Sequence, residues 1–221
     1  TRTSSSAASD VYKRQGDTGM NIFYLSAYPD QCAEMHCDKH VCKMIIEYAQ
    51  IMSTAHRVLD GEEYYGRTKN GRRIKRWKMN SNLEDILYKA SHVNHPSNQW
   101  VRASWRNYTW LYEMWECLCN EYTHRYGRKH ETDRKLRDVL LEPPRNIPHE
   151  HWSEPTQAMP DDVKIKGNSL IAYRNYYIKY KKDFAVWTKR TTPHWMTQNH
   201  NDTMIGCCLL YTSDAADDDV R

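Results

Sequence analysis

Apolar residues recur with helical period along two long stretches, which predicts that helices dominate the fold. In residues 31–59 they fall on one side of a helical wheel, Asp30 suits the N-cap position, and Asp60-Gly61 ends the pattern. Residues 96–126 carry a second apolar stripe, which Gly127 ends. Residues 20–28 form a short apolar run that predicts a strand or an extended entry.

Shorter elements complete the predicted fold. Residues 83–90, 131–141 and 168–188 have helical patterns, and the last of these is rich in tyrosine and lysine. Asn70-Gly71 is a strong turn signal, so residues 62–79 predict a β-hairpin. The sequence therefore predicts one mainly α domain with two long helices, a C-terminal aromatic-basic helix and a basic β-hairpin.

The two ends of the chain can be encoded by opposite strands of one DNA sequence. Residues 5–15 and 208–217 read as translations of complementary strands of what resembles an adapter of a transposon-based sequencing library. We therefore expect residues 1–19 and 206–221 to be adapter-derived tails, and residues 20–205 to form the single helical domain.

Charge and cysteine content narrow the class of protein. The chain has 32 Lys and Arg against 28 Asp and Glu, and without its two ends the net charge rises to +6, which favours an anionic partner. The cysteines form no CxxC pair, which favours reduced thiols over a disulfide scaffold. No apolar run is long enough to span a bilayer, so we expect no membrane association.

One face of the first predicted helix carries ionisable side chains. His36, His40, Lys43, Glu47 and Gln50 follow at spacings of four, three, four and three, which keeps them within a narrow arc. Two imidazoles, an ammonium and a carboxylate beside an apolar face can supply a general base, a proton donor and an anion clamp. We interpret this stripe as the edge of a reaction cleft; the alternative is a solvated face with ordinary i,i+4 pairs.

Histidines also raise the question of a metal. His36 and His40 could bind zinc from one helix face, with His92 and His95 on a loop that could supply further ligands. The segment HCDKH lacks the glutamate of HExxH, and no third ligand is marked by spacing. We therefore predict no metal and no other cofactor. His95, before Pro96, either lies where helix N–H groups attract an anion or caps and packs that helix.

Basic residues gather around the predicted hairpin turn. A two-stranded ribbon fits a nucleic-acid groove, and Lys and Arg displace counterions from phosphates; the alternative is a solvated hairpin. Trp77 could stack on a base or anchor the ribbon. The predicted nucleic-acid-binding residues are Arg67, Lys69, Arg72, Arg73, Lys75, Arg76 and Lys78 on the hairpin, and Arg174, Lys181 and Lys182 near the last helix.

Several segments between Met20 and about Met196 resemble a family of uncharacterised proteins of marine tailed phages. They are MNIFYL, HCDKHVCKMIIEYAQIMSTAHRVLDG, NHPSNQWVR, EYTHRYG, PPRNIP, QAMPDDVK, and AYRNYYI with WTKR. This resemblance implies a phage-encoded protein that acts in the host cytoplasm.

More distantly, the chain resembles the phage pyrimidine-dimer DNA glycosylases, which are compact all-helical enzymes. The shared features are an early helix with histidine and carboxylate (His36 to Glu47), a His-Pro turn before a long helix (His95-Pro96) and an aromatic-basic C-terminal segment (Tyr176 to Lys182). The resemblance implies that the N-terminal amine forms a Schiff base with the sugar. Glu47 departs from the spacing of the family's catalytic glutamate, and Asn21 disfavours removal of Met20, so the amine would be that of Met20.

Together these features predict a DNA-processing or repair enzyme of the glycosylase/lyase type, with DNA as its partner. The catalytic candidates are His36, His40, Glu47 and His95, and we expect their stripe and the basic hairpin to open onto one cleft. Two alternatives stay open: a metal-dependent hydrolase that uses His36 and His40, and a nucleic-acid-binding phage factor without catalysis.

Overall fold

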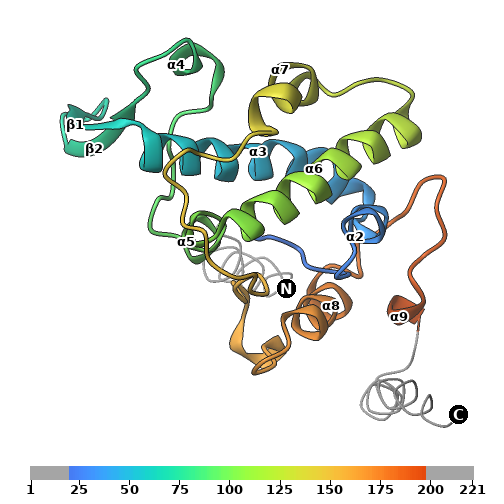
Figure 1. Ribbon diagram of the computed structural model, residues 1–221. Coiled ribbons are helices and arrows are strands. Elements are labelled where there is room, and N and C mark those ends of the chain that lie inside the picture. The colour runs from blue at the N-terminus through green and yellow to red at the C-terminus, as the bar shows by residue number, and fades with distance from the viewer. Residues whose placement is uncertain (1–19, 198–221) are drawn as a thin grey trace, which may run out of the picture.

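Helices build the body of the molecule, and one hairpin projects from it (Figure 1). The computed structural model describes residues 20–197, so the predictions for the two ends lie outside the described residues. In chain order the elements are α2 (Pro29–Met35), α3 (Asp38–Asp60), β1 (Glu62–Arg67), β2 (Arg73–Lys78), α4 (Leu83–Ile86), α5 (Pro96–Ala103), α6 (Trp105–Tyr126), α7 (Glu131–Leu140), the 3₁₀ turn η1 (Asp161–Val163), α8 (Ser169–Tyr180) and α9 (His194–Thr197). The predicted mainly α class with one hairpin is confirmed.

The first long helix is interrupted at His36 and Cys37. Both residues have extended backbone, with ψ of 130° and 160°, so α2 and α3 are separate helices. At the start of α3, the Asp38 N–H donates to the Val186 carbonyl at 2.8 Å. A carbonyl of the C-terminal segment therefore accepts a backbone N–H that would bond within the helix if α2 and α3 were continuous. The prediction of one helix over residues 31–59 is wrong at this point, and His36 does not belong to α3.

The second long helix is also two helices, because the chain turns at Ser104. The Ser104 hydroxyl accepts from the Arg106 N–H and donates to the Glu150 carbonyl, which fixes Ser104 as the N-cap of α6. The apolar stripe is nevertheless buried along its whole length; its members are Trp100, Tyr108, Leu111, Trp115, Leu118 and Tyr122. Gly127 ends α6 with a left-handed φ of 69°, a conformation that glycine adopts without strain.

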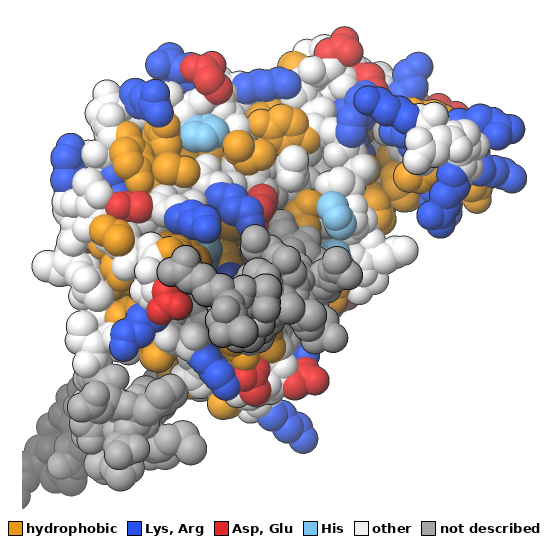
Figure 2. Space-filling model, turned by 180° about the vertical axis from the view of Figure 1, so that it is seen from behind, with side chains coloured by type: hydrophobic (Ala, Val, Ile, Leu, Met, Phe, Trp, Pro, Cys, Tyr) orange, Lys and Arg blue, Asp and Glu red, His pale blue; other side chains and the backbone are white. Residues whose placement is uncertain are grey.

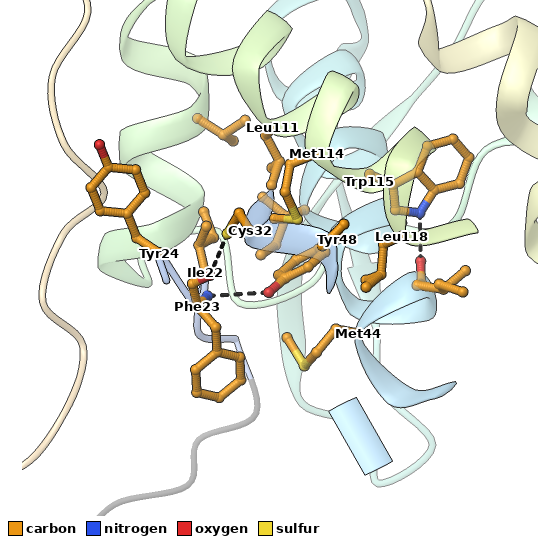
Figure 3. Packing of buried hydrophobic residues seen from close by; sticks show 14 of the residues in the cluster. Ile22, Phe23, Tyr24, Cys32, Met44, Tyr48, Leu111, Met114, Trp115 and Leu118 are labelled. Atoms are coloured by element: carbon orange, nitrogen blue, oxygen red, sulfur yellow. Dashed lines mark hydrogen bonds between the residues drawn. The ribbon is translucent and has the colours of Figure 1, made fainter. Parts of the chain in front are cut away.

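The core lies between α3, α6 and the extended N-terminal segment, residues 20–25 (Figure 3). The Trp115 indole N–H donates to the Ile45 carbonyl at 2.9 Å, which joins α6 to α3. The Phe23 N–H donates to the Tyr48 hydroxyl at 3.1 Å, which joins the N-terminal segment to α3. This segment is extended, as one of the two predicted possibilities, but it pairs with no strand among residues 20–197.

The hairpin is a two-stranded antiparallel ribbon, in which Glu62 pairs with Lys78 and Arg67 with Arg73. Thr68 and Arg72 close its turn, and Gly71 has a positive φ of 76°. Figure 1 shows α3 running directly toward this ribbon, which extends beyond the helical body. The predicted hairpin is confirmed.

The last predicted helix is shorter than expected, because α8 ends at Tyr180 rather than near residue 188. Its tyrosines face the protein: Tyr173, Tyr176 and Tyr177 are buried against the N-terminal segment. Over the described part of the chain, none of the helices combines the length and the apolar character needed to cross a bilayer.

Candidate active site

One face of α3 brings together most of the ionisable stripe. At about 100° per residue, His40, Lys43, Glu47 and Thr54 lie within about 60° of the helix circumference. We call this surface the α3 stripe. Lys43 Nζ lies 3.2 Å from Glu47 Oε1, and the two side chains are 42% and 13% exposed. The Glu47 carboxylate is therefore largely shielded from solvent, while the Lys43 ammonium beside it reaches the surface.

His40 sits at the buried end of this stripe. Its ring stacks on Phe23 with a centroid separation of 4.2 Å, and its Nδ1 lies 2.5 Å from the Tyr177 hydroxyl. Burial lowers the pKa of His40 well below its usual value, and the positive charges of Lys181, Lys43 and Lys39 lower it further. His40 is thus a neutral imidazole surrounded by lysines.

His36 lies inside the core rather than on the stripe. Its Nδ1 is 2.7 Å from the Cys32 carbonyl, which can only accept, so Nδ1 carries the proton and donates. Nε2 is then the acceptor of the Tyr48 hydroxyl at 2.8 Å. Burial lowers the pKa of His36 to about 4. With both nitrogens engaged and no exposed surface, His36 holds Tyr48, which in turn binds the backbone of Phe23.

The His-Pro turn reaches the same face of α3 further along. The Ser91 N–H donates to Thr54 Oγ1 at 3.3 Å, and Thr54 lies two turns, or about 10 Å, beyond Glu47. His95, four residues after Ser91, caps α5 by accepting the Ser97 N–H on Nδ1. Burial lowers the pKa of His95, and the nearby His92 adds to that effect. The structure therefore places His40, Glu47 and the turn that carries His95 along one helix face.

The predicted basic residues of the hairpin are mostly exposed, and Figure 2 shows the ribbon as a projection surrounded by Lys and Arg side chains. One of these cations has an acidic partner within the ribbon, because Lys75 forms an ion pair with Glu63 at 2.9 Å. Trp77 is half-buried, and its backbone carbonyl, not its indole, accepts from Arg57, which joins β2 to α3 at this residue. The ribbon begins at Glu62, about 22 Å along from Glu47, so the stripe and the ribbon do not line one small cleft.

The predicted cations near the last helix have mixed surroundings. Arg174 donates to the Leu25 carbonyl at 2.9 Å, and its guanidinium lies over Trp195. Lys181 is buried, with its ammonium 4.7 Å from the centre of the Tyr176 ring, and it acts on His40 electrostatically. Lys182 is exposed. Lys181 thus belongs to the interior beside His40, and Arg174 is half-buried against Leu25 and Trp195, so neither is a freely exposed phosphate-binding cation.

Residues 20–197 contain no group of three or more His, Cys, Asp or Glu side chains arranged to hold a metal ion. Because both nitrogens of His36 are hydrogen-bonded within the core, the pair His36 and His40 does not present two imidazoles to one ion. The five cysteines in this part of the chain are all free thiols: Cys32, Cys37, Cys42, Cys117 and Cys119.

Sequence reasoning missed two neighbours of His40. Phe23 belongs to an apolar run that indicates burial but not stacking on an imidazole. Lys39, which lies 4.4 Å from the centre of the Phe184 ring, directly precedes His40, and this adjacency was the available signal. The Phe23 contact joins two segments that are separate in the chain, which spacing alone does not reveal.

A basic helical body with an ionisable helix face and a projecting cationic ribbon has the features of a nucleic-acid-binding protein. Residues 20–135 match the family model of the pyrimidine dimer DNA glycosylases. This match covers more than half of the chain, and the chain therefore belongs to the pyrimidine dimer DNA glycosylase family, a family of DNA-repair glycosylases that act on DNA. No curated protein and no solved structure matches the chain.

Proposed function

We propose that this protein is a DNA glycosylase with lyase activity that removes a damaged pyrimidine from duplex DNA, and that it is phage-encoded and acts in the host cytoplasm. The observation that carries the activity is the family match over residues 20–135, which contain α3, the ribbon and the His-Pro turn. The α3 stripe faces the target nucleotide in this proposal, while cations further along the molecule hold the phosphates on either side.

Glu47 is the proposed acid–base group. Breaking the bond between C1′ and the base builds positive charge on the sugar, and a half-buried carboxylate stabilises such charge better than a solvated one. Lys43, at 3.2 Å, forms an ion pair with this carboxylate and orients it. The same ammonium lies near the surface, where it can also contact a phosphate.

His40 and His36 have different proposed roles. The neutral His40 ring is held between Phe23 and the Tyr177 hydroxyl, so it can donate or relay a proton at the end of the stripe. His36 is a positioning residue, because it orients the Tyr48 hydroxyl that holds the N-terminal segment against α3. His95 is proposed to face the substrate at the start of α5, where helix N–H groups attract a phosphate.

The position of the N-terminal segment supports amine chemistry at this place. Phe23 contacts His40, and Met20 lies only three residues before Phe23. An amine on Met20 would therefore lie within about 10 Å of Phe23 along extended chain. In the reaction, the amine nitrogen bonds to C1′ as the glycosidic bond breaks, and the base takes the electron pair and a proton; in a dimer this base stays joined to the neighbouring pyrimidine. The C1′–O4′ bond then opens, O4′ takes its electron pair and the second proton of the amine, and an imine between the amine nitrogen and C1′ remains. Borohydride reduces the resulting imine to a stable secondary amine.

The test compares the full chain with a chain that begins at Met20, each incubated with ultraviolet-irradiated duplex DNA and borohydride. We expect strand cleavage at the dimer without borohydride, and a trapped protein–DNA adduct with borohydride, from the chain that begins at Met20. Glu47→Gln should reduce both by at least a hundredfold, whereas Glu131→Gln, at an 89% exposed carboxylate on α7, should change neither. Absence of both strand cleavage and adduct for every form of the protein would refute the proposed activity.

If the protein binds DNA but gives neither strand cleavage nor a trapped adduct, we infer that it is a nucleic-acid-binding factor without catalysis. The exposed cations of the ribbon favour this second candidate, because phosphate binding by these side chains does not require Glu47. Under either function, charge reversal at Arg72, Arg73, Lys75 and Arg76 should abolish binding, and unchanged affinity would exclude both.

A further inference from the structure

The register of the ribbon divides its side chains between two faces. Residues directly opposite each other in an antiparallel pair share a face, and successive residues alternate. The Tyr64 face carries Glu62, Tyr64, Gly66, Ile74, Arg76 and Lys78. The Tyr65 face carries Glu63, Tyr65, Arg67, Arg73, Lys75 and Trp77.

The cations of the Tyr65 face are already engaged within the ribbon. Lys75 pairs with Glu63 at 2.9 Å, and the Arg73 guanidinium stacks 3.8 Å above the Tyr65 ring. Arg67 donates to the Gly71 carbonyl at 3.1 Å. Binding a phosphate on this face would have to replace contacts that exist, which reduces the net gain.

The Tyr64 face offers a different surface. Tyr64 and Ile74 are 45% and 40% exposed, although both are large apolar side chains. Within residues 20–197, neither Arg76 nor Lys78 has a carboxylate within 4 Å, although Glu62 lies opposite Lys78 in the register. Apolar side chains flanked by such cations suit a nucleic-acid groove, where cations bind phosphates and apolar groups contact sugars and base edges.

The ribbon is fixed in direction relative to α3. Arg57, fully buried near the end of α3, donates to the Trp77 carbonyl at the base of β2 and pairs with Glu84. Glu84 also accepts the Met79 N–H at 2.9 Å. A two-stranded ribbon with both faces exposed is marginally stable by itself, so these bonds at its base keep it aligned with the helix.

α3 therefore sets a distance between the proposed reaction site and the ribbon. From Glu47 to the start of β1 the helix rises about 22 Å at 1.5 Å per residue. Six residues of strand add about 20 Å. At about 3.4 Å per base pair, the ribbon spans about 6 to 12 base pairs from a nucleotide at Glu47 when α3 lies along the duplex.

We propose that the Tyr64 face of the ribbon binds a groove of double-stranded DNA to one side of the damaged base, about 6 to 12 base pairs away. Arg76 and Lys78 contact phosphates, and Tyr64 and Ile74 contact sugars and base edges. A two-stranded ribbon fits the major groove, which is about 12 Å wide. This inference rests on the proposed function, because it takes the target nucleotide to lie at Glu47.

Two charge-matched variants test which face contacts DNA. Arg76→Gln with Lys78→Gln removes two charges from the Tyr64 face, and Arg73→Gln with Lys75→Gln removes two from the Tyr65 face. The probe is a 40-base-pair duplex with one central thymine dimer, a length of about three to four helical turns. We expect the first variant to lower the slope of log affinity against log salt by about two, and the second to leave it within about half a unit. Equal losses in both variants, or none in either, would overturn the proposal.

A second measurement tests the distance and the side. The dimer is moved to about 5, 10, 15 or 20 base pairs from either end of the duplex, and affinity is measured for each. For the unaltered protein, affinity should fall about tenfold or more when the duplex on one particular side of the dimer is shorter than about 12 base pairs. Shortening the duplex on the other side of the dimer should change affinity little. The Tyr64-face variant should lose this dependence. An equal loss of affinity when either side of the duplex is shortened contradicts the inference. Tighter binding to single-stranded DNA than to the duplex also contradicts it.

These outcomes separate the inference from the proposed function. If the unaltered protein neither cleaves the longest duplex at the dimer nor forms a borohydride-trapped adduct with it, the proposed activity fails whatever the ribbon does. If it cleaves the duplex but shows no one-sided length dependence, only the assignment of the ribbon fails. Amide hydrogen exchange in β1 and β2 shows whether each variant keeps the ribbon folded.

Discussion

Replacement of Arg57 by methionine should strongly destabilise the domain and loosen the ribbon. The buried guanidinium donates to four carbonyls, those of Trp77, Glu84, Leu87 and Tyr88, and it also binds the Glu84 carboxylate. Methionine fills similar space but donates no hydrogen bond, so these acceptors lose their shared partner. The Glu84 carboxylate keeps Lys89 and the Met79 N–H, but the four carbonyls lose a charged donor, so we expect a loss of about 3 to 5 kcal/mol.

For a domain of this size, that loss corresponds to a fall in Tm of roughly 6 to 20 °C. Urea unfolding and calorimetry measure it, and hydrogen exchange should accelerate most in β1 and β2. Lys89→Met is the matched control, because Lys89 pairs with the same Glu84 but is 67% exposed, so its loss should cost at most about 1 kcal/mol. If Arg57→Met costs no more than Lys89→Met, the Arg57 contacts do not hold the ribbon to α3.

Three smaller perturbations probe the core. Acid should destabilise the domain below about pH 6.5, because burial lowers the pKa of His36 and of His56 to about 4. Below that pH the unfolded chain binds more protons than the folded one, so each histidine lowers the free energy of unfolding by about 2 kcal/mol between pH 7 and pH 5. Urea titrations at the two pH values measure this, and equal stabilities contradict it. Tyr48→Phe deprives His36 and a backbone N–H of the N-terminal segment of a buried partner, so unfolding in urea should show a loss of about 2 to 4 kcal/mol; an unchanged midpoint counts against the contact. Gly127→Ala should cost about 1 kcal/mol from its left-handed backbone alone, since no atom lies within 4 Å of an added Cβ, and a neutral thermal shift would contradict that reading.

Periodicity predicted where the helices lie, but not where they break. The interruption before Asp38 depends on the Val186 carbonyl and on Thr188, which lie about 150 residues away in the chain. The turn at Ser104 similarly depends on the carbonyl of Glu150. A spacing rule describes one helix in isolation, so it cannot include a partner that another segment supplies.

The same limit explains which parts of the candidate site could be predicted. His40 and Glu47 share a face because seven residues make nearly two full helical turns within α3. His36 would share that face on a continuous helix, and the break in the backbone removes it. The sequence predicts Lys181 as a nucleic-acid-binding residue near the last helix, yet the residue is buried and its ammonium lies over the Tyr176 ring.

The separation of the α3 stripe from the ribbon bears on the kind of ligand that the molecule can use. A small molecule at Glu47 could not reach cations that begin about 22 Å further along α3. A duplex can, because it presents phosphates continuously over that distance. One cleft shared by both features, as the sequence led us to expect, would permit a small anionic substrate. A contact near the middle of α3 and a second one beyond its C-terminal end suit an extended polyanion. The two contacts should have separate effects: Glu47 should govern the rate of glycosidic-bond cleavage, whereas Arg76 and Lys78 should govern affinity and its dependence on salt.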